Sequence, residues 1–377
     1  MHQYRHYVVQ PPTRLHSRKT DDTLSHMEKI ICDISALRYY RTPPRYLYAL
    51  PEICDFDTPY GRSKLREDPV ASRILGIPIH ALSLGGTRLT STLVQQHFRT
   101  KDIPANSIID TPFGASVTSP LLTLLMLAPK LDPIELALLI YEFTGTFTIS
   151  AMNRELAREI GLSMGANRLE RLDAWRTVGD DPERSNGLWS RPSLITLDAI
   201  RDFLALGTGF RGAPRLQRAM RYVTGCVASP FEAKASMLLG APRILGGEGL
   251  SGMRNNLPIR LDDYARRICG KQVVYGDIVW EATREHPAVI LECQGAIVHD
   301  SAFSAQDDDD RALALEQMGY QVIRITYKQI ADEARFQLLA KHLAELLNLT
   351  RRPPSFQTAK RQAMMRDKLF GPWPYCP

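Results

Sequence analysis

Two strand-like runs of this sequence each carry an acidic residue among apolar ones. The run YGDIVW contains Asp277, and the run VILECQ, which follows after a short polar segment, contains Glu292. Acidic residues are depleted from strands, and burying one without a partner is costly. A metal ion, a basic partner or exposure to solvent must therefore compensate Asp277 and Glu292.

The spacing of these residues predicts that the two acids share a site. Side chains alternate across a strand with period two, so Glu292 and Gln294 share one face while Cys293 points to the core. The segment EATREHP between the runs is short enough for a hairpin, which would place Asp277 beside Glu292. Carboxylates with open water positions suit Mg²⁺ or Mn²⁺. We expect Asp277 and Glu292 to hold such an ion, which can activate a water molecule and stabilise charge on a phosphate.

A longer set of motifs resembles a known family. Asp277, followed by Glu292-x-Gln294 on the next run, resembles the PD-(D/E)xK nuclease core. The ordered segments SPFEAKASMLL, YGDIVW, ILECQGAIVH and DDDDRALALEQMGYQVIRIT resemble the small endonuclease-domain family related to very-short-patch-repair endonucleases, over residues 229–330. The residues that fit the family pattern are Glu292, Gln294, Gly295, His299, Asp308, Arg311, Leu315, Gly319, Val322 and Arg324.

The resemblance implies a restriction-endonuclease-like α/β core that hydrolyses phosphodiester bonds in DNA. It places Glu232 near the metal, with Gln294 positioning water and His299 assisting as a proton shuttle. One departure is that Gln294 stands where the nuclease signature expects Lys. A Gln amide can orient water but carries no charge.

Each of these residues also has a purely structural interpretation. Glu232 follows Ser229 by three residues, which is the spacing of a helix capping box. Asp277 and Glu292 could lie exposed on a half-solvated sheet, and His299 could be an ordinary loop residue. The acidic run 307–310 is typical of a solvated helix N-terminus. Arg311 and Arg324 could be surface charges. The functional hypothesis is that they contact phosphate groups.

The N-terminal half resembles a different group. The segments ICDISALRYYRTPP and ASVTSPLLTLLMLA resemble parts of AbiEi-like type IV antitoxin and regulator proteins, some of which carry an endonuclease-like domain at their C-terminus. The winged-helix start that is usual in that group is not evident here. The resemblance implies a regulator, whose C-terminal fold would be a degenerate nuclease used for binding.

The periodicity of apolar residues and the positions of capping residues and prolines predict a mixed α/β chain. The second half runs helix, strands, helix, strand, helix. In the first half, Ser119-Pro120 and a second start near Pro133 predict two packed apolar helices, and Ser35 is a plausible N-cap for ALRYYR. The predicted units are an irregular N-terminus (1–25), an α+β domain (26–180), a helical connector (181–225), an endonuclease-like domain (226–350) and a basic tail (351–377).

Charge and cysteine content restrict the class of protein. The formal net charge is +6, and segment 351–377 contributes +5 of it through six Lys or Arg and one Asp, so we expect a solvated tail. The six cysteines contain no C-x-x-C pair, which favours reduced thiols in a cytoplasmic protein. The most apolar stretch is interrupted by charges and predicts packed helices, not a membrane span.

The sequence thus favours a Mg²⁺- or Mn²⁺-dependent DNA endonuclease. The alternative is an antitoxin-type or transcriptional regulator with a non-catalytic nuclease fold. Gln294 favours the regulator, and the retained acids favour the enzyme, because unpaired acids in a sheet destabilise it. DNA is the expected partner, and protein partners and oligomeric state stay open.

Overall fold

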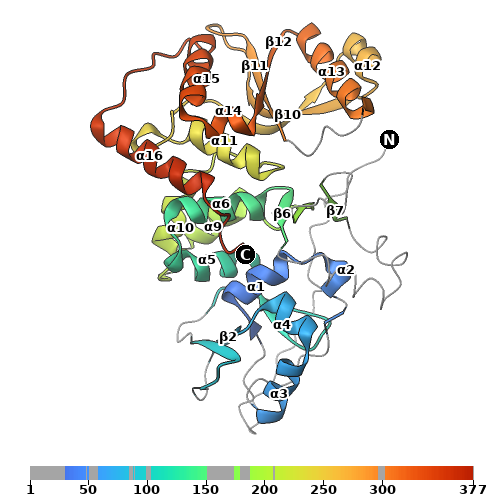
Figure 1. Ribbon diagram of the computed structural model, residues 1–377, viewed down its shortest axis with the longest axis vertical. Helices are drawn as coiled ribbons and strands as arrows, with labels where there is room; N and C mark the ends of the chain where they lie inside the picture. Colours follow the sequence, from blue (N-terminus) through green and yellow to red (C-terminus); the bar gives the residue numbers. More distant parts are fainter. Residues whose placement is uncertain are drawn as a thin grey trace.

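The computed structural model describes most of the chain, and Figure 1 shows its arrangement. The described residues are 30–47, 49–50, 58–84, 88, 90–98, 103–150, 174–178, 187–206, 209–295 and 302–376. No helix within these ranges is both long and apolar enough to cross a membrane. Helices and mixed sheets together confirm the predicted mixed α/β class.

The N-terminal half is built around a five-stranded mixed sheet of order β3-β2-β1-β5-β4. The central strand β1 is antiparallel to β2 and parallel to β5, while β2 and β3 are parallel. The strands are β1 (Ile30–Ile31), β2 (Ile79–Ser83), β3 (Val94–Phe98), β4 (Ile108–Asp110) and β5 (Ser116–Thr118). The helices of this half are α1 (Asp33–Tyr40), α2 (Pro44–Leu47), α3 (Pro59–Glu67), α4 (Pro69–Leu75), α5 (Pro120–Leu127), the 3-10 turn η1 (Ala128–Lys130) and α6 (Pro133–Thr144).

Local capping explains where the buried helices begin. Ser119 caps α5, and Asp132 caps α6 in a capping box with Glu135, so the two predicted apolar helices are confirmed. The expected N-cap of α1 is wrong: that helix begins at Asp33, and its N-cap is Cys32. The Ser35 hydroxyl instead accepts the backbone N–H of His80 on β2. Ser35 therefore extends the hydrogen bonding between α1 and the sheet.

The middle of the chain adds a small antiparallel sheet and two helices. The predicted amphipathic helices are present as α9 (Leu197–Ala205) and α10 (Ala213–Met220). The sheet has the order β6-β8-β7, with β6 (Phe147–Ile149), β7 (Arg176–Thr177) and β8 (Leu188–Ser190). Part of the predicted helical connector 181–225 is therefore strand β8, which pairs with both of its neighbours.

The C-terminal half contains a four-stranded sheet of order β12-β11-β10-β9. Alternate residues of β11 face opposite sides: Leu291 joins the core beneath α11, while Ile290 joins a second cluster with residues of α12 and α13. Helices therefore cover both faces (Figure 1). The elements are α11 (Pro230–Gly240), η2 (Arg243–Leu245), β9 (Arg254–Arg260), α12 (Asp263–Cys269), β10 (Val273–Trp280), β11 (Ala288–Gln294), α13 (Ala302–Gln317), β12 (Tyr320–Thr326), α14 (Tyr327–Ala331), α15 (Glu333–Leu346) and α16 (Phe356–Phe370).

The basic C-terminal segment is packed, so the expectation of a solvated tail is wrong. Helix α16 buries Met365 and Leu369, and Trp373 beyond it is also buried. Lys368 lies 2.8 Å from Asp132 and 3.0 Å from Glu135, which neutralises part of the tail's charge. In Figure 1 the red helix α16 descends from the C-terminal sheet to the level of α6, and the chain ends beside α1 and α5.

A buried polar network lies where these segments meet. Glu142 on α6 has no exposed surface and accepts hydrogen bonds from Arg41 at 2.8 and 2.7 Å, Thr148 at 2.6 Å and Trp373 at 2.8 Å. Burial alone would raise the pKa of Glu142, but the charge and hydrogen bonds of Arg41 hold it below its ordinary value. One continuous core cluster contains residues from Ile30 to Trp373 and so crosses the predicted boundary at 225/226. The proposed domain limits stay a prediction.

The packing of the C-terminal segment predicts that it contributes to the free energy of unfolding. Trp373→Ala removes a buried indole and leaves one Glu142 oxygen with fewer donors, so we expect a loss of about 3–5 kcal/mol of unfolding free energy. Phe356→Ala is the control, because Phe356, the first residue of α16, is 86% exposed and its truncation should change stability by less than about 0.5 kcal/mol. Urea denaturation measures both. Equal, small effects would show that the tail does not support the core.

Candidate functional site

A β-hairpin brings Asp277 and Glu292 to neighbouring strands, as predicted. Strands β10 and β11 are antiparallel, and Ile278 pairs with Leu291. Asp277 and Glu292 are the residues directly beyond this last pair, one on each strand. The intervening turn is closed by a hydrogen bond from the Thr283 N–H to the His286 carbonyl.

Asp277 occupies the place where the two strands part. The pairing of β10 with β11 ends at Ile278 and Leu291, and beyond it β11 pairs with β12 alone. The backbone N–H of Cys293 donates instead to Asp277 Oδ2, at 2.8 Å. The carboxylate thereby substitutes for a main-chain acceptor, which fixes its position beside the end of β11.

Both acids line one cavity of about 150 Å³. Its other walls come from the end of β11, the part of α13 from Asp308 to Leu315, and β12. Gln294 lines it on the same strand as Glu292, in agreement with the period-two prediction. The lining residues are Asp277, Glu292, Cys293, Gln294, Gly295, Asp308, Arg311, Ala312, Leu315, Val322 and Arg324.

Glu232 approaches from α11, the helix that packs on β10 and β11. Ser229 is the N-cap of this helix, and its hydroxyl accepts the Glu232 N–H at 3.1 Å. The predicted capping box is not formed, because the Glu232 carboxylate accepts from the N–H of Ala228 at 2.8 Å. Its side chain is 6% exposed and senses the charges of both Asp277 and Glu292.

The three carboxylates keep raised pKa values, although Arg311 pairs with Glu292. Burial and the charge of Asp277 raise the pKa of Glu232 from about 4.5 to about 8. The same two causes raise the pKa of Glu292 to about 8, although Arg311 opposes them. Burial also raises the pKa of Asp277, against the hydrogen bond from Cys293. Groups whose pKa is shifted by burial and by like charge inside a cavity are typical of functional sites.

The two arginines expected to contact phosphate are paired with acids of the protein. Arg311 Nη2 lies 3.0 and 3.1 Å from the two Glu292 oxygens and also donates to the Tyr275 carbonyl. Arg324 contacts Asp309 at 2.8 Å and the Asp308 carbonyl at 3.1 Å. Both guanidinium groups line the cavity, so they remain available to an anion that enters it. That they bind phosphate stays a prediction.

Three further sequence predictions concern Cys293, the acidic run 307–310 and His299. Cys293 packs against the main core, as expected from its alternation with Glu292. The acidic run 307–310 lies inside α13, which begins at Ala302, so its interpretation as a helix N-terminus is wrong, and Asp308 lines the cavity. His299 lies outside the described residues.

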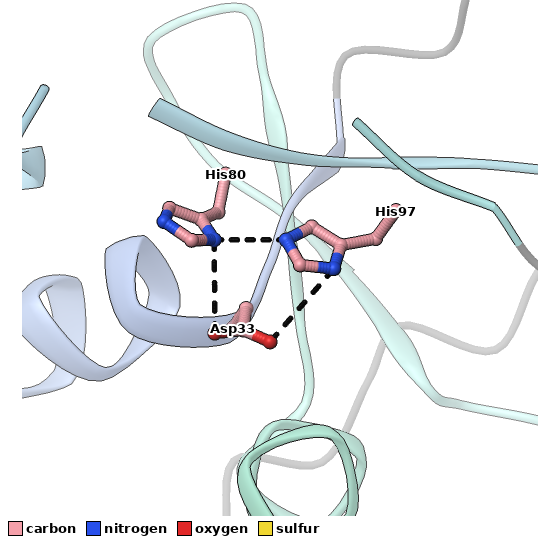
Figure 2. Close-up of side chains that lie close together, drawn as sticks. All are labelled: Asp33, His80 and His97. Atoms are coloured by element: carbon pink, nitrogen blue, oxygen red, sulfur yellow. Dashed lines mark hydrogen bonds and ion pairs between the residues drawn. The ribbon is translucent and has the colours of Figure 1, made fainter. Parts of the chain in front are cut away.

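A second group of potential metal ligands was not predicted from the sequence. Asp33, His80 and His97 lie close enough together to hold a metal ion, and Figure 2 shows their side chains converging. Asp33 is 1% exposed, and burial is the main cause that lowers the pKa of His80 to about 4. The one available signal was that two strand-like runs, IPIHAL and LVQQHF, each carry a histidine.

Comparison with known proteins assigns no family to this chain. No family model, no curated protein and no solved structure matches it.

The raised pKa of Glu232 predicts how stability depends on pH when no divalent metal is present. Between about 4.5 and about 8, folded Glu232 keeps a proton that the unfolded chain has lost. The stabilisation is complete below the lower value and is lost as the pH rises through the upper one. Glu232→Gln keeps an oxygen for the Ala228 N–H and removes the titration. Its melting temperature, measured with a chelator, should therefore fall less steeply over this range than that of the wild type.

The control for this measurement is Glu281→Gln. Glu281 follows β10, is 58% exposed and pairs with Arg254. Its variant should keep the wild-type slope. A Glu232→Gln slope equal to that of the wild type would contradict the assignment of a protonated buried carboxyl at this position.

Proposed function

We propose that this chain is a divalent-metal-dependent phosphodiesterase that cleaves DNA as an endonuclease. The supporting observation is a single cavity that contains Asp277, Glu292 and Gln294, approached by a third buried carboxyl on Glu232. The order of elements around it is α11, β9, α12, β10, β11, α13 and β12, so the predicted helix–strands–helix–strand order is interrupted by α12.

The donor set of the cavity fits a hard divalent cation. Asp277 and Glu292 offer carboxylate oxygens on neighbouring strands, and both have raised pKa values that a cation would lower. Oxygen ligands of this kind suit Mg²⁺ or Mn²⁺. When bound, such an ion supplies an activated water and charge stabilisation at the phosphate.

The protein's own residues have distinct roles in this proposal. The Gln294 amide, on the same face as Glu292, orients the attacking water in place of the usual Lys. Glu232, with a pKa of about 8, is protonated at neutral pH and can give a proton to a departing oxygen. Arg311 and Arg324 place positive charge at the cavity wall, where a DNA phosphate would pair with them. An assisting role for His299 stays a prediction.

A regulator with a non-catalytic site is the second candidate. Two observations favour it: Arg311 already neutralises Glu292 at 3.0 Å, and no Lys stands at position 294. An internal cation of this kind can replace a metal and leave a surface that only binds DNA.

Plasmid nicking separates the two candidates. Wild-type protein should nick supercoiled DNA with Mg²⁺ or Mn²⁺ and not with a chelator. Asp277→Asn and Glu292→Gln should reduce nicking by at least about 100-fold, because each removes a charged oxygen that holds the cation. Glu281→Gln, on the same sheet outside the cavity, should nick as the wild type does. DNA binding without nicking by purified wild type would support the regulator and reject the enzyme.

Arg311→Gln should have opposite effects on metal binding and on DNA cleavage. It removes the cation that competes for Glu292, so the rise in melting temperature with Mn²⁺ should be larger than in the wild type. It also removes a phosphate contact, so nicking should fall at least about tenfold. Thermal melting with and without Mn²⁺, together with the nicking assay, measures both. A variant that loses the Mn²⁺ effect would show that Arg311 supports the metal site instead of competing with it.

A further inference from the structure

Three potential metal ligands meet at the ends of three adjacent strands in the N-terminal half. Asp33 directly follows the segment that leaves β1, His80 lies on β2, and His97 lies on the parallel edge strand β3. His80 pairs with Gln95 and His97 with Leu82, so the two histidines are diagonal neighbours on one face. Figure 2 shows both rings turned toward the Asp33 carboxylate. We propose that Asp33, His80 and His97 form a zinc-binding site, separate from the proposed nuclease cavity.

The backbone fixes two of these residues relative to each other. The Cys32 N–H donates to the His80 carbonyl at 2.9 Å, and the His80 N–H donates to the Ser35 hydroxyl at 3.0 Å. His80 is thus held from both sides by the segment that contains Asp33. Asp33 itself has a φ of 55°, a left-handed conformation that is uncommon outside glycine, and its Oδ1 accepts the Ile34 N–H at 2.8 Å. The carboxylate is therefore held facing the histidines before any ion binds.

One ligand atom from each of the three residues can be chosen so that all three lie within 4.8 Å of one another, and His97 turns Nδ1 toward Asp33 and Nε2 toward His80. His80 Nδ1 lies 3.7 Å from Asp33 Oδ1, and His97 Nδ1 lies 3.9 Å from Asp33 Oδ2. His80 Nδ1 and His97 Nε2 are 2.8 Å apart, a hydrogen bond in which one of the two nitrogens must offer a lone pair. Ligands around zinc, bound at about 2.0–2.2 Å, lie roughly 3.3 Å from one another. A small opening of the histidine pair would admit the ion.

The ligand types select zinc over the hard cations of the other site. Two imidazoles and one carboxylate are a common zinc set, whereas Mg²⁺ prefers oxygen ligands alone. Three protein ligands also leave a fourth position for water. The chain would then contain two sites of different chemistry, one nitrogen-rich in the N-terminal half and one carboxylate-rich in the C-terminal half.

Lys130 now supplies the positive charge that buried Asp33 requires. Its ammonium lies 2.6 Å from Asp33 Oδ1, and its side chain is 36% exposed. A partly exposed lysine on the short turn η1 can swing into solvent, which would free the oxygen for zinc. Lys130 is therefore a competitor of the ion, and its removal should strengthen zinc binding.

Zinc binding to the full chain tests this inference. Chelator-treated protein is titrated with Zn²⁺ alone by equilibrium dialysis, and Co²⁺ is used as a visible-absorption probe of tetrahedral coordination. Wild type and the cavity variant Asp277→Asn/Glu292→Gln should each bind one equivalent at this site. His97→Gln should weaken binding at least about 100-fold, and Lys130→Met should strengthen it at least about tenfold by removing a like charge.

Controls keep the test independent of folding and of the nuclease cavity. His342→Gln changes an exposed histidine on α15 and should leave zinc binding unaltered. His97 lies on an edge strand, so its variant should keep the wild-type circular dichroism spectrum. Zinc binding that survives both His80→Gln and His97→Gln would overturn the inference. So would a Lys130→Met variant with wild-type affinity, since Asp33 would then not be a ligand.

Discussion

Glu142 is a carboxylate with no exposed surface, and segments far apart in the chain supply its partners. Arg41 comes from the end of α1, Thr148 from β6 and Trp373 from the C-terminus. Removing one partner from a buried ion pair typically costs about 3–5 kcal/mol, because the remaining charge stays buried. The buried network therefore joins α1, α6, the small sheet and the C-terminal segment. The C-terminal segment 351–376 belongs to its core and supports the helices α6 and α11 on which the C-terminal sheet rests.

The contrast between Glu142 and the cavity acids supports the proposal that the cavity is a functional site. All these carboxylates are largely buried. Arg41 overcomes burial at Glu142 and lowers its pKa, whereas the pKa values of Glu232 and Glu292 rise to about 8. The protein balances the charge of a structural acid. The charge of an acid that binds a ligand stays unbalanced until the ligand is bound. Asp33 lies between these cases, because its balancing charge is a partly exposed lysine that can leave.

Local patterns predicted the features that depend on neighbouring residues. The hairpin, the shared face of Glu292 and Gln294, and the caps at Ser119 and Ser229 all follow from spacing within one or two elements. The packed tail was missed because its apolar residues are few and lie among six basic ones, and their burial depends on α6. The Asp33 group was missed for a similar reason: the strand order β3-β2-β1 brings its members together, and no short motif encodes that order. The pairing of Arg311 with Glu292 likewise depends on how α13 crosses the sheet.

The central claim is that the cavity between β10, β11 and α13 binds a divalent cation. The most direct test is a crystal of the full chain soaked in MnCl₂, with diffraction measured at the manganese absorption edge. The account predicts an anomalous peak at coordination distance from both Asp277 and Glu292, with Arg311 displaced from Glu292. A well-ordered cavity without such a peak, in which Arg311 still pairs with Glu292, would contradict it.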